Sequence, residues 1–481
     1  MGALGRTAGE LCGSDVEALG HTLIPFKQVA VGVVAIAIGL GAQRQAPYVV
    51  GKNVQVSLLF PDARHYETQI AADPEDASHF LIGAYTVNGD DSIDNVFYVS
   101  FDGGRSWTRT LRVPVGVDPA VAIGSEGVAF VATIHDVPRP DGNSDSFLMV
   151  HRSADGGRTW SESAVQVDSR SVDRNYIAID EARGRVYVHG YFQDPRDAEG
   201  KRTKSTFVLY TSDDGGRTFA RRAVREAAGP LTPKPVPANS IVLPDGTLLA
   251  LAVTLDATRL NMFKGRSDAA SAPDLNGVLG MLRSVDGGHT LEPLAQVTEV
   301  HYDWRVPQLS MAGLALDRGA GPFRGRLYAV WPEARVDRRT QIFSASSDDG
   351  GRTWTTPRLV SDEGPSSPNP RPNQFMPAVA VNRDGVVGVS WYDRRDNADN
   401  LGYWPRFSAS LDGGATFLSS VRVSTSPNLV LDPKETRFNS GDTAGLAADA
   451  AGGFHPAWID NRTGTHQVWT TSVSVRGMVR R

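Results

Sequence analysis

Three short stretches of the sequence place a tryptophan, an acid and an arginine at the same spacing. They read Trp331-Pro-Glu333-Ala-Arg335, Trp391-Tyr-Asp393-Arg-Arg395 and Trp458-Ile-Asp460-Asn-Arg462. Residues two apart on a strand point to the same side, so each acid can pair with its own arginine or with one of a neighbouring repeat. A carboxyl group can also transfer a proton, and a guanidinium can bind an anion through paired donors. Two interpretations stay open: a repeated structural salt bridge with the Trp wedged between repeats, or a substrate-binding surface.

The elements that must hold these side chains follow from a motif that the chain repeats six times. Each copy reads Ser-x-Asp-Gly-Gly-x-Ser/Thr, as in Ser347 to Thr353, and five copies continue with an aromatic residue. Asp and Gly tolerate the positive φ of tight turns, so this Asp-Gly-Gly motif predicts a hairpin. Its aspartates are Asp102, Asp155, Asp214, Asp286, Asp349 and Asp412. Their spacing, roughly 50 to 70 residues, fits a four-stranded propeller blade with its loops.

The repeats predict an all-β protein, a seven-bladed β-propeller over residues 51–476 with a short tail at 477–481. A typical unit, from Val306 to Val360, contains four short strand-like stretches, with the motif between the third and the fourth. The last unit, from Thr443 to Val475, has only three such stretches. Because Asn53–Ser57 reads like a fourth strand, we expect it to complete the last blade and remove its open edge. A ring of six blades is the alternative count.

The two faces of such a ring differ in what they carry. The Asp-Gly-Gly motifs would all lie on one face and stabilise turns. The opposite face would carry the longer loops and blade crossings, among them Tyr392 to Arg406 and Thr425 to Asp442. Binding and catalytic residues usually lie on long loops of a rigid scaffold, so we expect the function on this second face.

Composition and the N-terminus narrow the class of protein. With 49 Lys and Arg against 54 Asp and Glu, the chain lacks the basic excess of a nucleic-acid-binding surface.

The apolar run Val29 to Leu40 fits a signal peptide within a leader at 1–50, which predicts a secreted or periplasmic protein; an uncleaved membrane anchor is the alternative. Because Cys12 precedes that run, the mature chain would contain neither a disulfide nor a thiol ligand.

We expect no cofactor and no catalytic metal. The ten histidines show no pair at ligand spacing, and the Gly-Gly pairs lack the strand-to-helix context and lysine of a phosphate loop. Two Asp-rich loops, Asn88 to Asp91 and Asp393 to Asn400, leave structural calcium as an alternative. We expect a monomer.

The Asp-Gly-Gly motifs resemble the Asp-boxes of the sialidase-like (BNR repeat) β-propellers, and the resemblance covers nearly everything after residue 50. In addition, Trp304-Arg305-Val306-Pro307 is similar to the aromatic-Arg-Ile-Pro motif of sialidases, whose arginine belongs to a triad that binds the substrate carboxylate. The corresponding stretches of other units read Phe375-Met376-Pro377 and Val117-Asp118-Pro119, so the Pro is also explained as a feature of blade entry.

The resemblance implies a set of site residues. Arg305 would bind the carboxylate, and Glu333, Arg335 and Asp337 would form an acidic loop in which Asp337 is the general acid and base. A sialidase mechanism also needs a tyrosine nucleophile, for which Tyr403 is the candidate, with Tyr302 and Tyr392 as alternatives. Further substrate contacts are predicted at Arg395, Arg462, Asp393 and Asp460, and Arg174 and Arg437 could supply cations.

The sequence therefore predicts an exported, glycan-active enzyme, and most concretely a sialidase-like exo-glycosidase that hydrolyses a terminal acidic sugar. Its ligand would be a glycan or polysaccharide. Two alternatives remain: a non-catalytic propeller that binds polysaccharide or protein through its loop face, and a polysaccharide lyase with a Tyr or His base beside an arginine.

Overall fold

A computed structural model of the chain describes residues 46–138, 144–168, 172–193, 205–226, 234–255, 275–302, 312–334, 339–362, 368–369, 371–430, 440–477 and 479. The predicted leader therefore lies outside the described residues up to residue 45, and so do Arg305, Arg335, Asp337 and Arg437. Within the described ranges, no helix is long and apolar enough to span a membrane.

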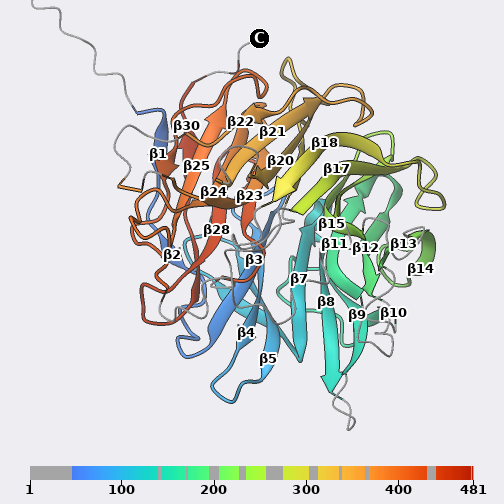
Figure 1. Cartoon of the computed structure of the whole chain (residues 1–481). Helices are drawn as coiled ribbons and strands as arrows, with labels where there is room; N and C mark the ends of the chain where they lie inside the picture. The colour runs from blue at the N-terminus through green and yellow to red at the C-terminus, as the bar shows by residue number, and fades with distance from the viewer. Residues whose placement is uncertain are drawn as a thin grey trace, which may run out of the picture. The chain divides into compact units, whose positions relative to one another are not determined.

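Seven antiparallel sheets are arranged in a ring, which confirms the seven-bladed β-propeller and excludes the count of six (Figure 1). Six blades use four consecutive strands each. Blade 1 comprises β3 (Arg64–Ala72), β4 (Phe80–Val87), β5 (Ile93–Ser100) and β6 (Thr108–Pro114); blade 2 comprises β7 (Gly116–Ile123), β8 (Ala129–Pro138), β9 (Ser144–Ser153) and β10 (Val165–Asp168); blade 3 comprises β11 (Val172–Asp180), β12 (Arg185–Gln193), β13 (Ser205–Ser212) and β14 (Ala220–Glu226). Short 3-10 helices, η1 (Ser125–Gly127) and η2 (Glu181–Arg183), join the first two strands of blades 2 and 3.

The remaining blades follow the same plan. Blade 4 comprises β15 (Lys234–Val242), β16 (Leu248–Leu255), β17 (Leu275–Ser284) and β18 (Ala295–Tyr302); blade 5 comprises β19 (Gly313–Leu316), β20 (Leu327–Glu333), β21 (Gln341–Ser347) and β22 (Arg358–Leu359); blade 6 comprises β23 (Gln374–Val381), β24 (Val387–Asp393), β25 (Trp404–Ser410) and β26 (Val421–Arg422). The first strand of each blade contacts the first strands of both neighbouring blades, so these strands surround the centre of the ring.

The N-terminal strand completes blade 7, as the sequence predicted. Blade 7 contains β27 (Gly445–Ala448), β28 (Phe454–Asp460) and β29 (Gln467–Thr470), and its outer strand is β2 (Val54–Gln55), which pairs antiparallel with β29. One further pair was not predicted: β1 (Tyr48–Val50) pairs with β30 (Val473–Val475), which also meets β28. The chain therefore closes the ring with strands from both of its ends.

The hydrophobic core lies between the blades. A representative cluster joins Leu249, Leu251 and Met281 of blade 4 to Leu314 and Trp331 of blade 5, and every one of these side chains is at most 2% exposed. The inner strands are buried on both faces because each blade is covered by two others. This is why β20 and β24 are continuously buried rather than alternating.

The Asp-Gly-Gly motifs form the turns between the third and fourth strands of blades 1 to 6. In blade 5, Asp349 Oδ1 accepts hydrogen bonds from the backbone N–H groups of Arg352 and Thr353, both at 2.9 Å. The Ser347 hydroxyl donates to the same oxygen and accepts from the Gly351 N–H. Gly350 and Gly351 have φ of 71° and 82°, where a side chain would be strained. Stabilisation of the turn is therefore sufficient to explain why the chain repeats this motif.

The motifs also join neighbouring blades. In five consecutive junctions, a side chain of one blade donates a hydrogen bond to the carbonyl of the first motif glycine in the next blade. The pairs are His79 with Gly156, Arg152 with Gly215, Thr211 with Gly287, Arg283 with Gly350, and Arg326 with Gly413. Among the described residues, no such bond from blade 7 reaches Gly103, the corresponding glycine of blade 1. The junction that closes the ring therefore differs from the others.

Candidate functional site

Five innermost strands, β3, β7, β11, β15 and β23, carry a β-bulge at the point where the chain enters the blade, and in β23 the bulged residue is the apolar Met376, with φ of 56°. In β3, β7 and β11 the bulged residue is charged. The register shifts between Tyr66 and Gln69 in β3, between Val117 and Ala120 in β7, and between Asp173 and Tyr176 in β11. The bulged residues Glu67, Asp118 and Arg174 have φ of 51°, 53° and 54°. A charged residue with positive φ is uncommon, and such strain and such bulges are frequent at functional sites.

These bulges bring charged side chains from four blades together at the centre of the ring. Arg174 of blade 3 forms an ion pair with Asp442, which lies just before β27 of blade 7. Asp118 of blade 2 accepts a hydrogen bond at Oδ2 from the backbone N–H of Arg174, at 3.0 Å. Glu67 of blade 1 lines the same small cavity as Asp442, Asp118 and Arg174. We call Glu67, Asp118, Asp442 and Arg174 the central cluster.

Backbone contacts hold the segment that precedes β27 of blade 7 against Glu67. The Glu67 N–H donates to the Ser440 carbonyl at 3.0 Å, and Gly441 has φ of 78°. A Cβ at Gly441 would lie 2.2 Å from Cγ of Glu67, so only glycine fits there. The position of Asp442 beside Glu67 is therefore set by the chain itself.

Two carboxyl groups of the central cluster hold their protons unusually strongly. Burial, followed by the charges of Asp442 and Asp118, raises the pKa of Glu67 well above its ordinary value. Burial and the charges of Asp173 and Asp442 raise the pKa of Asp118 to about 8. Carboxyl groups this close cannot all ionise, so protons are shared among them. Arg174 forms its ion pair with the third carboxylate, Asp442. The cluster thus offers protonated and ionised carboxyl groups side by side.

Two small cavities lie near the centre of the ring, and the central cluster lines one of them. One of about 10 Å³, room for roughly one water molecule, is lined by the cluster together with Asn175 and Thr443. A second, of about 130 Å³, shares Gln69, Tyr176 and Thr443 with the first. The amide of Asn175 is only 2% exposed, and neither of its polar atoms has a hydrogen-bond partner among the described residues. An unpaired buried amide is costly unless something binds to it, which supports a ligand at this point.

A tyrosine and an acid form a second pair beside Arg174. The Tyr191 hydroxyl donates a hydrogen bond to Asp173 Oδ2 at 2.6 Å, and Asp173 is adjacent to Arg174 in β11. Burial, together with the charge of Asp173, raises the pKa of Tyr191 well above its ordinary value. Tyr191 therefore remains protonated at neutral pH.

The predicted pairs Asp393 with Arg395 and Asp460 with Arg462 are both formed. Arg395 Nη2 donates to Asp393 Oδ2 at 2.7 Å, and Arg462 Nε donates to Asp460 Oδ1 at 2.9 Å. Both acids are fully buried, and each also accepts a hydrogen bond at 2.8 Å from the indole of the preceding tryptophan, Trp391 or Trp458. These contacts match the structural interpretation of the repeated spacing, while the predicted substrate contacts of the four residues stay predictions.

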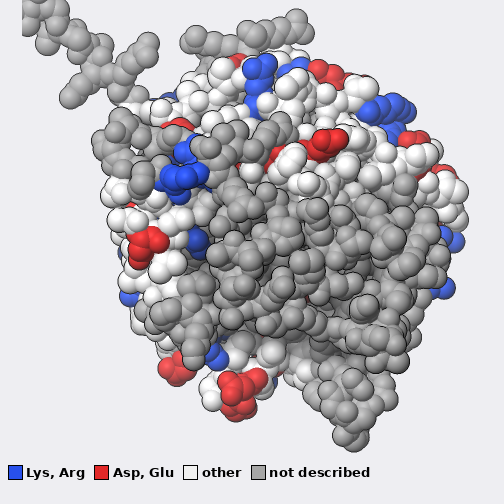
Figure 2. All heavy atoms as spheres, in the orientation of Figure 1, with Lys and Arg blue, Asp and Glu red and all other residues white. Residues whose placement is uncertain are grey.

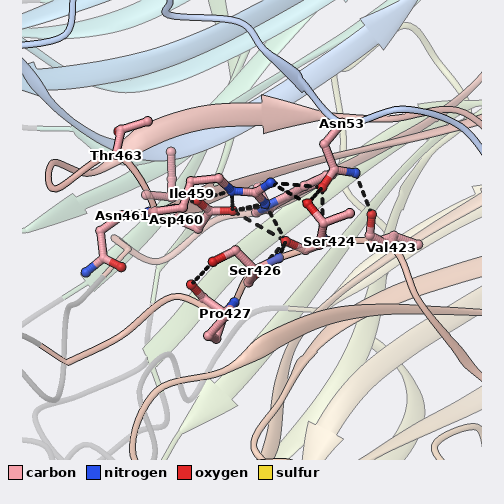
Figure 3. Close-up of polar contacts among 12 residues, drawn as sticks. Asn53, Val423, Ser424, Ser426, Pro427, Ile459, Asp460, Asn461 and Thr463 are labelled. Atoms are coloured by element: carbon pink, nitrogen blue, oxygen red, sulfur yellow. Dashed lines mark hydrogen bonds and ion pairs between the residues drawn. The ribbon is translucent and has the colours of Figure 1, made fainter.

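Arg462 also fastens the closure of the ring. It donates to Asn53 Oδ1 at 3.0 Å, and Asn53 in turn donates to the Val423 carbonyl and accepts from the Thr425 N–H, both at 2.8 Å. Figure 3 shows Asn53, Ser424 and Asp460 converging in this network from three separate parts of the chain. The network thus connects the N-terminal segment, blade 6 and blade 7.

Glu333 and Tyr403, two of the predicted catalytic residues, lie in buried surroundings. Glu333 is fully buried and accepts a hydrogen bond from the Trp331 indole at 3.0 Å, and His301 Nδ1 lies 3.3 Å from its other oxygen. The Tyr403 hydroxyl donates to the Ile459 carbonyl at 2.9 Å, and its ring stacks on Tyr392. Burial raises the pKa of Tyr403, which opposes formation of a nucleophilic phenolate. Their catalytic roles stay predictions.

The sequence interpretation missed most of the central cluster. It named Arg174 only as one available cation and Asp118 only as part of a blade-entry stretch, and it did not consider Glu67 or Asp442 as site residues. The available signal was position: each lies at the entry to an innermost strand, where a bulge turns its side chain toward the centre.

Neither a metal site nor a one-signed surface is evident in the described ranges. No group of three or more His, Cys, Asp or Glu side chains there could hold a metal ion. On the face shown in Figure 2, the described basic and acidic side chains are scattered and mixed rather than gathered by sign. This distribution gives no indication of a surface for a highly charged polymer.

No protein-family model matches the sequence, and no curated protein is significantly similar to it. Solved structures resemble the chain at low identity. A protein of unknown function from Dyadobacter fermentans is 13% identical, with 89% of this chain and 100% of that chain covered and a TM-score of 0.44. A Hadza microbial sialidase is 14% identical, with 88% and 91% covered and a TM-score of 0.44. An α-L-arabinanase from Penicillium chrysogenum is 13% identical, with 89% and 98% covered and a TM-score of 0.43. Similarity this weak identifies neither a reaction nor a substrate.

Proposed function

We propose that the chain is a glycan-active enzyme, a glycoside hydrolase of the sialidase-like (BNR repeat) propeller type, whose reaction takes place at the central cluster. The observation that carries the proposal is the juxtaposition of Asp118, whose raised pKa keeps it protonated, with the Asp442 carboxylate, which is ion-paired to Arg174. Glycoside hydrolysis needs this combination: one carboxylic acid to protonate the leaving oxygen and one carboxylate to act as base or nucleophile.

Each residue then has a defined role. Asp118 donates its proton to the glycosidic oxygen as the bond to the sugar breaks. Asp442 either activates a water or attacks the sugar directly, and Arg174 orients it. Glu67 shares a proton with Asp442 and regulates its charge. Asn175, buried and unpaired, provides an amide for a substrate hydroxyl.

The finer proposal is a sialidase-like exo-glycosidase for a terminal acidic sugar. The position of the Tyr191–Asp173 pair beside Arg174 supports it, because a sialidase mechanism uses a tyrosine next to an acid, whereas the raised pKa of Tyr191 opposes a phenolate as it does for Tyr403. However, the described cluster places Glu67, Asp118, Asp173 and Asp442 around one arginine, which favours a neutral sugar. An acidic substrate would depend on Arg305 and Arg335, which lie outside the described residues.

The test is hydrolysis of a panel of fluorogenic glycosides that contains a sialoside, a glucuronide and neutral sugars. We expect the parent protein to hydrolyse at least one, and Asp118→Asn to lower kcat by about 10²–10⁴-fold. Asp349→Asn makes the same chemical change in a motif turn on the opposite face and should leave kcat within a few-fold of the parent.

The outcome separates the alternatives. No turnover of any glycoside, or equal turnover by parent and Asp118→Asn, would contradict the proposal and favour a binding propeller. An unsaturated uronate product, detected by its ultraviolet absorbance, would indicate a lyase instead. The finer proposal requires the sialoside to be the preferred substrate.

A further inference from the structure

The junction between blade 7 and blade 1, where the ring closes, contains a cavity of about 770 Å³. It is lined by Lys52 to Val56 around the outer strand β2, by residues 470–472 after β29, and by the Asp-Gly-Gly motif of blade 1. This volume lies within the range of roughly 300–1,000 Å³ that is usual for small-molecule sites. It is far larger than the cavities at the central cluster.

The cavity occurs where the regular contact between blades is missing. At the five junctions described above, a donor from the preceding blade reaches the first motif glycine of the next. At this junction His455 of blade 7 lines the cavity beside the motif of blade 1, and its Nε2 is bound to Asp449 Oδ2 at 2.7 Å. Among the described residues, the Gly103 carbonyl accepts no hydrogen bond from blade 7. A backbone acceptor therefore remains for a ligand, although blades 7 and 1 share a buried core cluster.

The charged side chains that line the cavity, apart from His455, are both basic. Lys52 and Arg105, both exposed, line it, and no Asp or Glu is among the described lining residues. The two nearby carboxylates are already engaged, Asp449 by His455 and Asp102 by the N–H groups of its own turn. A site with two cations and no lining acid attracts an anion.

The other lining side chains suit a ligand with a flat apolar face and several hydroxyl groups. Trp107 contributes an aromatic ring, and Leu58 and Leu59 are 64% and 72% exposed at the margin. Exposed leucines side by side are unusual unless a surface contact uses them. Gln55, Thr470 and Ser472 add polar groups. A sugar ring presents such a face together with hydroxyl groups.

We propose that this junction is a binding site for an anionic saccharide, separate from the central cluster, in which Lys52 and Arg105 contact a carboxylate and Trp107 packs against a sugar ring. The proposal rests on the proposed function only for the choice of a sugar as ligand. It needs no turnover, so either proposal can fail without the other.

The test is calorimetric titration of the full chain carrying Asp118→Asn, so that hydrolysis does not interfere. The probes are hyaluronan tetrasaccharide, which carries carboxylates, and chitotetraose, which is neutral. We expect tighter binding of the hyaluronan fragment, with an affinity that falls as salt is added. Lys52→Glu combined with Arg105→Glu should weaken binding by at least about tenfold.

Arg217→Glu provides the matched control, because Arg217 occupies in blade 3 the motif position that Arg105 occupies in blade 1. It should bind the hyaluronan fragment like the parent. No binding of that fragment, equal binding of both tetrasaccharides, or equal weakening by Arg217→Glu and by the double substitution would overturn the proposal. Unchanged thermal unfolding of each variant excludes misfolding as the cause.

Discussion

The Arg174 guanidinium and the Asp442 carboxylate form an ion pair that links blade 3 to the entry of blade 7, although these blades are not neighbours in the ring. The pair passes beside Glu67 and Asp118, which come from the two blades between them. A contact across the middle of the ring thus holds the groups to which we assign the chemistry.

The pH dependence of activity should report Asp118. Because burial and neighbouring charges raise its pKa to about 8, Asp118 carries the required proton below that pH and loses it above. We expect kcat/KM to fall as the pH rises through about 8. In Asp118→Asn the residual activity should lack this alkaline limb. An unchanged limb in the variant would assign the titration to another group.

The same protonation affects stability. The unfolded Asp118 releases its proton near pH 4, whereas the folded one retains it to about pH 8, so the folded state binds more protons between these values. Its stabilising contribution is therefore complete below pH 4 and is lost as the pH rises through 8. From pH 5 to pH 8, the free energy of unfolding measured in urea should decrease more for the parent than for Asp118→Asn. Equal decreases would contradict the raised pKa.

The ion pair between Arg174 and Asp442 should contribute to stability as a unit. Arg174→Gln removes a charged hydrogen-bond partner and should lower the free energy of unfolding by about 1.5–3 kcal/mol. In a double-mutant cycle with Asp442→Asn, the free energy of unfolding of the double variant should fall by less than the sum of the decreases in the two single variants. Strict additivity in urea unfolding would show that the two side chains do not interact.

The Asp-Gly-Gly turn of blade 5 should affect stability without affecting chemistry. Partial burial raises the pKa of Asp349, but hydrogen bonds from Thr353, Ser347 and Arg352 outweigh it and lower the pKa to about 2. Asp349→Ala should cost about 1 kcal/mol at neutral pH, because several hydrogen bonds are lost at a partly exposed site. The parent's advantage should vanish as the pH falls from 4 toward 2. A loss of kcat comparable to that of Asp118→Asn would contradict the separation of the two faces.

Asn53 should be needed for closure of the ring. Asn53→Ala removes the hydrogen bonds to Val423, Thr425 and Arg462 and should lower the free energy of unfolding by about 1–3 kcal/mol. Lys52→Ala changes the adjacent exposed side chain and should stay within about 0.5 kcal/mol of the parent. Equal effects of the two substitutions in urea unfolding would show that the network does not stabilise the closure.

The fold could be predicted because its signals are local. Each Asp-Gly-Gly motif encodes a turn within about seven residues, and the regular spacing of the six motifs predicts a ring of blades, with seven as the expected count and six as the alternative. The closing strand was also predictable, since the last unit lacks a fourth strand and the stretch that contains Val54 and Gln55 reads like one. The pairing of β1 with β30 was not, because three residues carry too little pattern to reveal a partner.

The candidate site was less accessible from sequence because its members share no motif. Glu67, Asp118 and Arg174 lie in stretches that differ in text and agree only in being bulged. By contrast, the tryptophan, acid and arginine repeat was easy to see, and its best-described contacts are internal pairs such as Asp393 with Arg395. A repeated spacing indicates what the scaffold needs in every blade, whereas a reaction needs side chains that differ from blade to blade.

The hydrogen bond from Arg462 to Asn53 joins residues 409 positions apart. During synthesis the N-terminal strand leaves the ribosome long before its partners in blade 7. Until then the nascent chain is an open arc with an unpaired edge at the end where blade 7 must later dock, a state prone to association with other chains. Production of this protein should therefore depend on protection of that edge, by chaperones for example, until blade 7 has been synthesised.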